Sequence, residues 1–430
     1  MTKPATLCLA PWVHTYLSPQ TERRMCCASR EPAQNFQQYI DVSAGTGRYI
    51  PITLDEHWNS EHMRSVRRRM IAGKTLPECE VCNDKLLNTS VYRSYFDSLF
   101  GHKYLQVLES TDETGYTTMK PVSWDYRFSN LCNFKCRMCG DMLSSAWESE
   151  QRQYNMINWH DPKNNWMKPE IKKHIEEFQD TQIEAEFSQA VEGHSVEEVY
   201  WVGGEPLMYE QHWRYMKRII ELGDGKNVYA RYNTNLSRCH YKGVNLYSDI
   251  LQHLRDWQIC ASLDGTGKIG EYIRTGLDYD RWLANFREGV AISTNRRQMR
   301  IDFTLTLPGM FEVGNIQTLS QELGVEVLAK VIFSFSPDIV MSPLALPRDL
   351  LDSWIDEILD VVDNRPLKDI LVQLKTRPTF AEQWPGEYKS GLIKGKKRIL
   401  ELERIRKDVY TMNDILANRP AVLEWWNEIC

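Results

Sequence analysis

Six short apolar runs between residues 122 and about 336 constrain the fold more than any other feature of the sequence. They read VSWDYRF, VEEVYWVGG, NVYARYNTN, WQICASLDG, MRIDFTLTL and VLAKVIFSF. Helical patterns such as YEQHWRYMKRIIELG and YDRWLANFREGVAIS lie between them. Strands that alternate with helices form parallel sheets, because each helix carries the chain back to the start of the next strand. The sequence therefore predicts an α/β fold, either an open barrel or a doubly wound sheet.

The flanking regions have different patterns. Residues 1–100 are rich in cysteine and show little strand periodicity, but LDEHWNSEHMRSVRRRMIAG predicts one amphipathic helix that ends at Gly73. We expect a connector over 101–121, the α/β region over 122–343 and a helical region over 344–430. Roughly 55 residues separate Cys139 from Val196, too many for a plain connection, and they predict a lid or a substrate-facing insertion.

Composition narrows the setting. The formal net charge is -6, so the chain has no basic footprint and a nucleic-acid partner is not favoured. The start, MTKPATLCLAPW, lacks the apolar core of a secretory signal, and no run approaches the ~20 apolar residues that cross a bilayer. We therefore expect a cytoplasmic protein without membrane contact. In that reducing compartment, its 11 cysteines are expected to be metal ligands more than disulfides.

Three cysteines lie together in the stretch NLCNFKCRMCG, at positions 132, 136 and 139. The stretch follows the first predicted strand, so it belongs to the carboxyl edge of the sheet, where parallel α/β proteins place their chemistry. A structural zinc site normally has four protein ligands, and no fourth is present locally. Three thiolates on an iron–sulfur cubane would leave one iron open for a small molecule. The spacing Cys132, Cys136, Cys139 therefore favours such a cluster.

This loop, with the aromatic Phe134 inside it, resembles that of the radical S-adenosylmethionine superfamily. The resemblance implies a partial (β/α)6 barrel in which Cys132, Cys136 and Cys139 hold a [4Fe–4S] cluster. In that family S-adenosylmethionine chelates the open iron, and one electron cleaves it to a 5′-deoxyadenosyl radical that abstracts hydrogen from a substrate. The cofactor supplies this chemistry and the protein orients it.

Further matches to the family follow in the same order along the chain. The second strand ends in a turn like the family's GGEP motif, the third in a TN-like end, and the fourth in an S-x-D motif. The resemblance implies cofactor-binding roles for Phe134, Gly203, Gly204, Glu205, Asn235, Ser262, Asp264 and Arg274. Within these, Glu205 would face the ammonium group and Arg274 the carboxylate of the cofactor.

The N-terminal cysteines resemble the auxiliary-cluster module called twitch, a shorter relative of the SPASM domain, here placed before the barrel. The resemblance implies that Cys8, Cys26, Cys79 and Cys82 hold a second [4Fe–4S] cluster. Cys27 could replace Cys26, but two adjacent residues cannot readily both bind one cluster. Tetrahedral zinc is the alternative for these four thiols.

The resemblance implies an enzyme that cleaves S-adenosylmethionine and abstracts hydrogen from a peptide, as related enzymes crosslink, oxidise or epimerise peptides. A small-molecule substrate is the alternative, and a zinc-stabilised scaffold without catalysis is the alternative of another class. A flavodoxin or ferredoxin would donate the electron. Cys430 is a candidate for returning hydrogen to a substrate radical. On the first strand we expect Asp125 and Arg127 to form an ion pair inside the barrel, with contacts to the substrate as the alternative.

Overall fold

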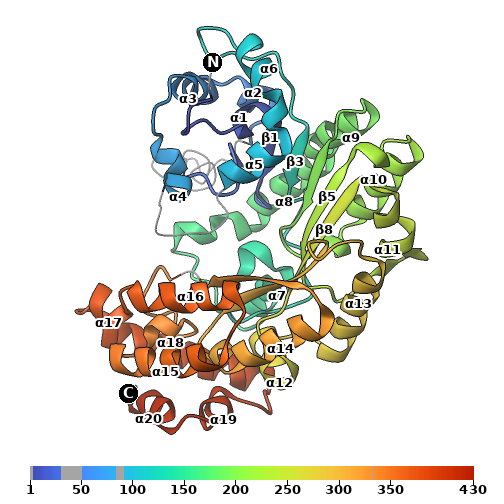
Figure 1. Ribbon diagram of the computed structural model, residues 1–430. Helices are drawn as coiled ribbons and strands as arrows, with labels where there is room; N and C mark the ends of the chain where they lie inside the picture. Colours follow the sequence, from blue (N-terminus) through green and yellow to red (C-terminus); the bar gives the residue numbers. More distant parts are fainter. Residues whose placement is uncertain (1–2, 31–50, 84–91, 333) are drawn as a thin grey trace. The chain divides into compact units, whose positions relative to one another are not determined.

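The computed structural model describes residues 3–30, 51–83, 92–332 and 334–430. Its contacts divide the chain into two compact units, each discontinuous in sequence. Unit 1 comprises Met1–Leu131, Glu148–Arg231 and Ser248–Trp257, and unit 2 comprises Cys132–Trp147, Tyr232–Tyr247 and Gln258–Cys430. The fold is α/β, with a mostly parallel eight-stranded sheet, as the sequence predicts (Figure 1). The predicted boundaries at residues 100, 121 and 343 stay a prediction.

All six predicted strands are present. They are β3 (Ser123–Tyr126), β4 (Glu198–Trp201), β5 (Tyr229–Thr234), β8 (Asp256–Ser262), β9 (Met299–Leu305) and β10 (Glu326–Val331). The sheet order is β10-β9-β8-β5-β4-β3-β1-β2, so these six strands follow their order in the chain without a reversal. A doubly wound sheet reverses direction at a switch point. Of the two predicted arrangements, the sequential order therefore excludes the doubly wound one.

Two further strands come from the N-terminal segment, where little strand structure was expected. β1 (His14–Leu17) pairs in parallel with β3, with His14 opposite Ser123 and Leu17 opposite Tyr126. β2 (Arg23–Arg24) pairs antiparallel with β1. The expectation was wrong because β1 has four residues that are all buried, so it shows no alternation of apolar and polar positions.

The single helix predicted over 54–73 is two helices, α2 (Leu54–Trp58) and α3 (Glu61–Ile71). Thr53 and Glu56 form a capping box at the start of α2, and Ser60 caps α3 through the backbone of Met63. Arg67 of α3 donates to the carbonyl oxygen of Trp58 at 2.7 Å. The buried guanidinium thus satisfies a carbonyl that the break between the helices leaves without a helical partner.

The remaining helices of the N-terminal segment are α1 (Ala10–Val13), α4 (Glu80–Asn83), α5 (Tyr92–Phe100) and α6 (Tyr104–Glu109). The predicted connector over 101–121 therefore contains a helix. The long segment after Cys139 is also helical, with α7 (Ser145–Gln153), α8 (Pro169–Phe178), a π-helical turn over Gln179–Ile183 and α9 (Glu184–Glu192). Its predicted role as a lid or insertion stays a prediction.

An aromatic layer packs one face of the sheet in unit 1 against α9 and α10 (Glu210–Glu221). Phe187 of α9 lies 5.5 Å from Trp124, 6.0 Å from Trp201 and 5.0 Å from Tyr215, measured between ring centroids. Such edge-to-face pairs add about 0.5–1.5 kcal/mol each to the burial of apolar area. The strands are thereby held so that their alternate residues occupy the other, polar face.

Unit 2 contains a β-hairpin and the helices that follow β8. The hairpin is β6 (His240–Tyr241) and β7 (Val244–Asn245), followed by α11 (Leu246–Asp249). The helices that follow β8 are α12 (Gly267–Ile273), α13 (Tyr279–Ile292), α14 (Val313–Leu323), α15 (Arg348–Val361), α16 (Arg365–Thr376), α17 (Phe380–Gln383), α18 (Tyr388–Arg406), α19 (Met412–Leu416) and α20 (Pro420–Glu428). Across the described ranges, none of the helices has the length and apolar content to span a bilayer.

Candidate functional site

Hydrogen bonds from the start of α7 hold the backbone of the cysteine loop of unit 2. Ser144 donates its hydroxyl to the carbonyl of Phe134 at 2.6 Å, and Ser145 accepts from the backbone N–H of Cys132 at 3.1 Å. Trp147 donates its indole N–H to the carbonyl of Cys136 at 2.7 Å. Three side chains of one helix start therefore fix the backbone on which the thiols stand.

A buried arginine within the loop ties it to the C-terminal region. Arg137 lies 3.7 Å from the ring centroid of Tyr272, donates to the hydroxyl of Thr275 at 2.7 Å and forms an ion pair with Asp408, just after α18. Arg406 of α18 donates to the same Thr275 hydroxyl at 3.1 Å. No motif pointed to Arg137 or Asp408, which are 271 residues apart. The C-terminal helices thus contribute to the position of the loop.

The thiols of the loop lie in a desolvated and polar setting. Burial raises the pKa of Cys136, and it raises that of Cys139 to about 12, with the neighbouring Cys136 adding to the shift. The Cys132 sulfur accepts the backbone N–H of Phe134 at 3.4 Å. Thiolates in this setting need positive charge nearby, which a bound metal supplies.

Three of the predicted cofactor-binding residues are brought to these sulfurs. Asn235, just beyond β5, donates its amide to the Cys132 sulfur at 3.9 Å. Arg274, just beyond α12, lies 3.9 Å from the Cys136 sulfur and 2.7 Å from Asp264, measured from Nη1 and Nε respectively. Segments that follow β5, β8 and α12 therefore come together at one loop, although the motifs are far apart in the chain.

Arg274 and Asp264 form a buried ion pair. Asp264 is fully buried and also accepts the backbone N–H of Thr304 at 2.8 Å. Burial acts to lower the pKa of Arg274, but Asp264 and Cys136 outweigh it and raise that pKa. Burial raises the pKa of Asp264 against the opposing charge of Arg274. The pair keeps a cation beside the thiols; the predicted contacts of these two residues with a cofactor stay predictions.

The backbone just past β5 is strained. Leu236 is fully buried and has φ of +52°, a left-handed conformation that is uncommon for a residue with a side chain. Asn285 donates its side-chain amide to the carbonyl of Leu236 at 2.8 Å. The backbone N–H of Leu236 donates to the hydroxyl of Thr234 at 2.9 Å. Strain of this kind costs about 1–3 kcal/mol and concentrates at functional sites. Here it turns the chain directly after Asn235.

The GGEP turn belongs to unit 1, where it packs on residues 127–131. A Cβ on Gly204 would lie 2.3 Å from the carbonyl oxygen of Leu131, and Gly203 has φ of +122°. Glu205 donates its N–H to the same carbonyl at 2.7 Å, while its buried carboxylate accepts the N–H of Leu207 at 3.0 Å. The glycines therefore allow close contact with the chain just before the cysteine loop.

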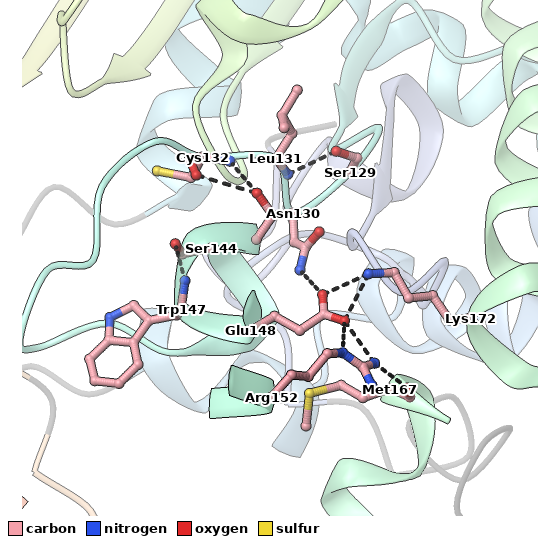
Figure 2. A network of polar contacts seen from close by, with 11 residues as sticks. Ser129, Asn130, Leu131, Cys132, Ser144, Trp147, Glu148, Arg152, Met167 and Lys172 are labelled. Carbon is pink, nitrogen blue, oxygen red and sulfur yellow. Dashed lines mark hydrogen bonds and ion pairs between the residues drawn. The ribbon is translucent and has the colours of Figure 1, made fainter. Parts of the chain in front are cut away.

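Glu148 of α7 holds the residues just before the cysteine loop, within unit 1 (Figure 2). Its carboxylate accepts from Asn130 at 3.2 Å, from Lys172 at 2.7 Å and from Arg152 at 2.9 Å. Burial acts to raise the pKa of Glu148, but these donors outweigh it and lower the pKa. An ionised carboxylate thus holds the residue two positions before Cys132.

The polar face of the sheet in unit 1 carries the residues that alternate with its aromatic layer. Asp125 and Arg127 form the predicted ion pair at 3.1 Å, which is confirmed. Arg231 lies between Tyr95 and Tyr200, 4.2 Å and 3.7 Å from their ring centroids. Polar and aromatic side chains on one sheet face provide hydrogen-bonding groups and flat apolar surfaces together.

The N-terminal thiols share one apolar core. Cys8, Cys26 and Cys79 are buried among Leu7, Leu9, Trp12, Met25, Met63, Val66, Met70, Leu76, Phe96 and Phe100. Burial raises the pKa of Cys8 to about 12, and the charges of Cys79 and Cys82 raise it further. Burial likewise raises the pKa of Cys26, with Cys27, Cys8 and Cys82 adding to the shift. The assignment of these four thiols to one cluster stays a prediction.

Cys27 has different neighbours. Burial raises its pKa, Asp125 raises it further, and Arg127 and a hydrogen bond from Tyr92 lower it. These groups belong to the polar sheet face and to α5. The assignment of Cys26 and not Cys27 as the fourth ligand, a choice that the sequence left open, stays a prediction.

The donor set fits iron–sulfur clusters, because soft thiolates are the usual ligands of these cofactors. Two sulfurs already accept backbone N–H groups two residues ahead, Cys8 from Ala10 at 3.5 Å and Cys132 from Phe134 at 3.4 Å. Within the described parts of the chain, no three Cys, His, Asp or Glu side chains form a group that could hold a single metal ion. The predicted ligand sets stay predictions.

Three predicted residues have other surroundings. Phe134 is buried, and its ring lies where a Cβ on Gly276 would be 2.9 Å away. Ser262 ends β8 and is half-buried. Cys430 is exposed and its thiol contacts the carbonyl of Glu428 at 3.3 Å. Their predicted roles with a cofactor or substrate stay predictions.

Comparison with known proteins gives little. No protein-family model matches the chain, and no curated protein sequence matches it. Among solved structures, the chain is similar to SuiB of Streptococcus suis, in a crystal structure described as bound to the precursor peptide SuiA. The match has 13% sequence identity and a TM-score of 0.30, and covers 50% of this chain and 57% of SuiB. The chain thus spans little more than half the length of that protein.

Proposed function

We propose that the protein is a radical S-adenosylmethionine enzyme with a partial (β/α)6 barrel and an N-terminal twitch-like module. The observation that supports this most is the meeting of two motif-bearing segments at the cysteine loop, one just after β5 and one just after α12. Asn235 approaches the Cys132 sulfur and Arg274 the Cys136 sulfur, each at 3.9 Å. A chance cysteine cluster has no reason to attract motif residues from separate elements.

In this proposal Cys132, Cys136 and Cys139 hold a [4Fe–4S] cluster, and Cys8, Cys26, Cys79 and Cys82 hold a second one. When bound, the first cluster and S-adenosylmethionine together supply one-electron cleavage of the sulfonium and hydrogen abstraction from the substrate. The protein would be cytoplasmic, as the sequence analysis expects.

The chain's own residues position this chemistry. Arg274, kept charged by Asp264, stands beside the thiolates and offsets their negative charge. Ser144, Ser145 and Trp147 fix the loop backbone. A peptide is the first substrate class to test, and a small molecule the second.

The test is anaerobic purification followed by iron analysis, absorption spectroscopy and incubation with S-adenosylmethionine and dithionite. We expect a brown protein with about eight irons per chain that forms 5′-deoxyadenosine. A colourless protein that holds zinc and forms no deoxyadenosine would instead support the zinc-stabilised scaffold. Brown protein that leaves S-adenosylmethionine intact with every peptide and small molecule tried would contradict the proposed reaction.

A further inference from the structure

A cavity of about 480 Å³ in unit 2 borders the cysteine loop. Asn133 and Phe134, which lie between Cys132 and Cys136, form one wall. The hairpin β6–β7 with the residues before it forms the second wall, and the turn between α12 and α13 forms the third. None of the motifs discussed above accounts for this cavity, which we call the basic cavity.

The charge of the basic cavity contrasts with that of the chain. Its lining carries four basic side chains, Arg238, His240, Lys242 and Arg281, against one acid, Asp278. The carboxylate of Asp278 is engaged in capping α13, through the backbone N–H of Arg281 at 3.0 Å. The whole chain is negative, with a formal charge of -6. A concave patch of one sign raises the local concentration of partners of the opposite sign.

Two arginines of the basic cavity carry charge that no acid of the described chain neutralises at close range. Arg281 is exposed, so this positive charge extends from the cavity to the surface. Among the described residues, the guanidinium groups of Arg238 and Arg281 have no ion pair within 4.0 Å. Cations that served only to stabilise the fold would be expected to pair with acids nearby.

A short path of polar side chains joins the basic cavity to the first cysteine. Asn133 donates its amide to the hydroxyl of Ser237, another lining residue, at 3.1 Å. Asn235 donates to the carbonyl oxygen of the Asn133 side chain at 2.9 Å and lies 3.9 Å from the Cys132 sulfur. A partner seated in the cavity would therefore be separated from the predicted cluster by the loop itself.

We propose that the basic cavity is the docking site of an acidic one-electron donor protein of the flavodoxin class. The proposal rests on the proposed function, which requires one electron from outside the chain. That electron passes from the reduced flavin of the donor to the cluster, with no bond formed or broken in either protein. Electron-transfer partners use small, weak interfaces whose encounter is steered by charge, which matches an exposed basic hollow.

The first experiment measures binding directly. Titration calorimetry at about 10 mM salt, where the screening length is about 30 Å, compares wild type with the variant Arg238→Glu, Lys242→Glu, Arg281→Glu. We expect the Kd for flavodoxin to rise at least about tenfold in the variant and the difference to shrink at about 0.5 M salt. The control Arg365→Glu, Lys389→Glu, Lys397→Glu changes the net charge equally on exposed helix positions and should keep the wild-type Kd.

The second experiment separates docking from chemistry. Deoxyadenosine formation is followed with flavodoxin, its reductase and NADPH, and separately with dithionite. We expect the variant to lose at least about tenfold in kcat/KM for flavodoxin and to keep dithionite-driven turnover within about twofold. Equal loss with both reductants would overturn the docking site, because the residues would then act on the reaction or the fold. Unchanged turnover and unchanged binding would overturn it too.

Two further results keep the outcomes distinct. If wild type forms no deoxyadenosine with dithionite, both the proposed function and the docking site are refuted. If wild type is active with dithionite but wild type and variant do not differ with flavodoxin, only the docking site is refuted. The neutral variant Arg238→Gln, Lys242→Gln, Arg281→Gln replaces the reversed one if the latter has a lower melting temperature. It should show the same effects at smaller size, because it removes attraction without adding repulsion.

Discussion

The two sets of cysteines differ in their surroundings more than in their burial. Burial raises the pKa of Cys8 in the N-terminal core and of Cys139 in the loop, each to about 12. Of the N-terminal thiols, Cys8, Cys26 and Cys79 lie among aliphatic and aromatic side chains, with Arg93 as a hydrogen-bond partner of Cys79. The loop thiols face Arg274, which is paired with Asp264, and the amide of Asn235.

This difference indicates a division of labour. Four thiols, three of them inside an apolar core, can saturate a centre and exclude other ligands, so such a centre would stabilise the fold or relay electrons. Three thiols beside a charged pair and an amide leave room for a polar ligand that those groups can orient. We therefore expect reactivity at the loop and stability in the N-terminal core.

A matched pair of cysteine variants, one in each set, tests this division between reactivity and stability. Cys136→Ala should reduce deoxyadenosine formation at least about tenfold, because three-point ligation of the cluster is lost. Cys8→Ala should mainly lower the free energy of unfolding, by about 2–4 kcal/mol, because it opens a cavity and removes a metal ligand. Turnover assays and anaerobic urea titrations measure both quantities for each variant. A stable Cys8→Ala protein with turnover as low as that of Cys136→Ala would refute the division.

The adjacent pair Cys26 and Cys27 sharpens the same comparison within the N-terminal core. Cys26 is coupled to Cys8 and Cys82, whereas Cys27 neighbours Asp125, Arg127 and Tyr92. Cys26→Ala should therefore lose about four irons per chain, and Cys27→Ala should keep them and lose about 1 kcal/mol or less. Iron analysis and thermal melts distinguish the two. Equal iron loss in both variants would mean that the couplings do not report the ligand.

The smallest expected effect is the pH dependence of the stability that Glu148 contributes beside the cysteine loop. The donors Lys172, Asn130 and Arg152 hold the pKa of Glu148 below its usual range despite burial, which acts to raise it. The stabilisation is complete above the unfolded-state pKa of about 4.3 and is lost as the pH falls through the lower folded-state pKa. Glu148→Gln should cost about 1–3 kcal/mol at pH 7. Its deficit relative to wild type should close below about pH 4.

Urea titrations from pH 3 to 8 measure this dependence. Glu61→Gln is the matched control, because Glu61 pairs with Arg68 at 2.8 Å while its side chain is 74% exposed. It should change stability by less than about 1 kcal/mol at any pH. A Glu148→Gln deficit that does not vary with pH would show that the carboxylate acts through packing and not through its charge.

The six strands between residues 122 and 336 were predictable because each is a run of apolar or alternating residues next to helical patterns. β1 and β2 were not, since His14–Leu17 is buried throughout and Arg23–Arg24 has only two residues. The motif residues Asn235, Asp264 and Arg274 could be named from their order along the chain. That Arg274 pairs with Asp264 could not, because both were expected to face a cofactor.

Local pattern and spacing were enough to determine the α/β class and the groups of thiols, because strand alternation and loop spacing are properties of neighbours in the chain. The Arg137–Asp408 ion pair and the basic cavity were decided only by the tertiary structure. Each depends on which distant segments share a desolvated space. Burial and charge then set the energy of a side chain, and neither is a property of its sequence neighbours.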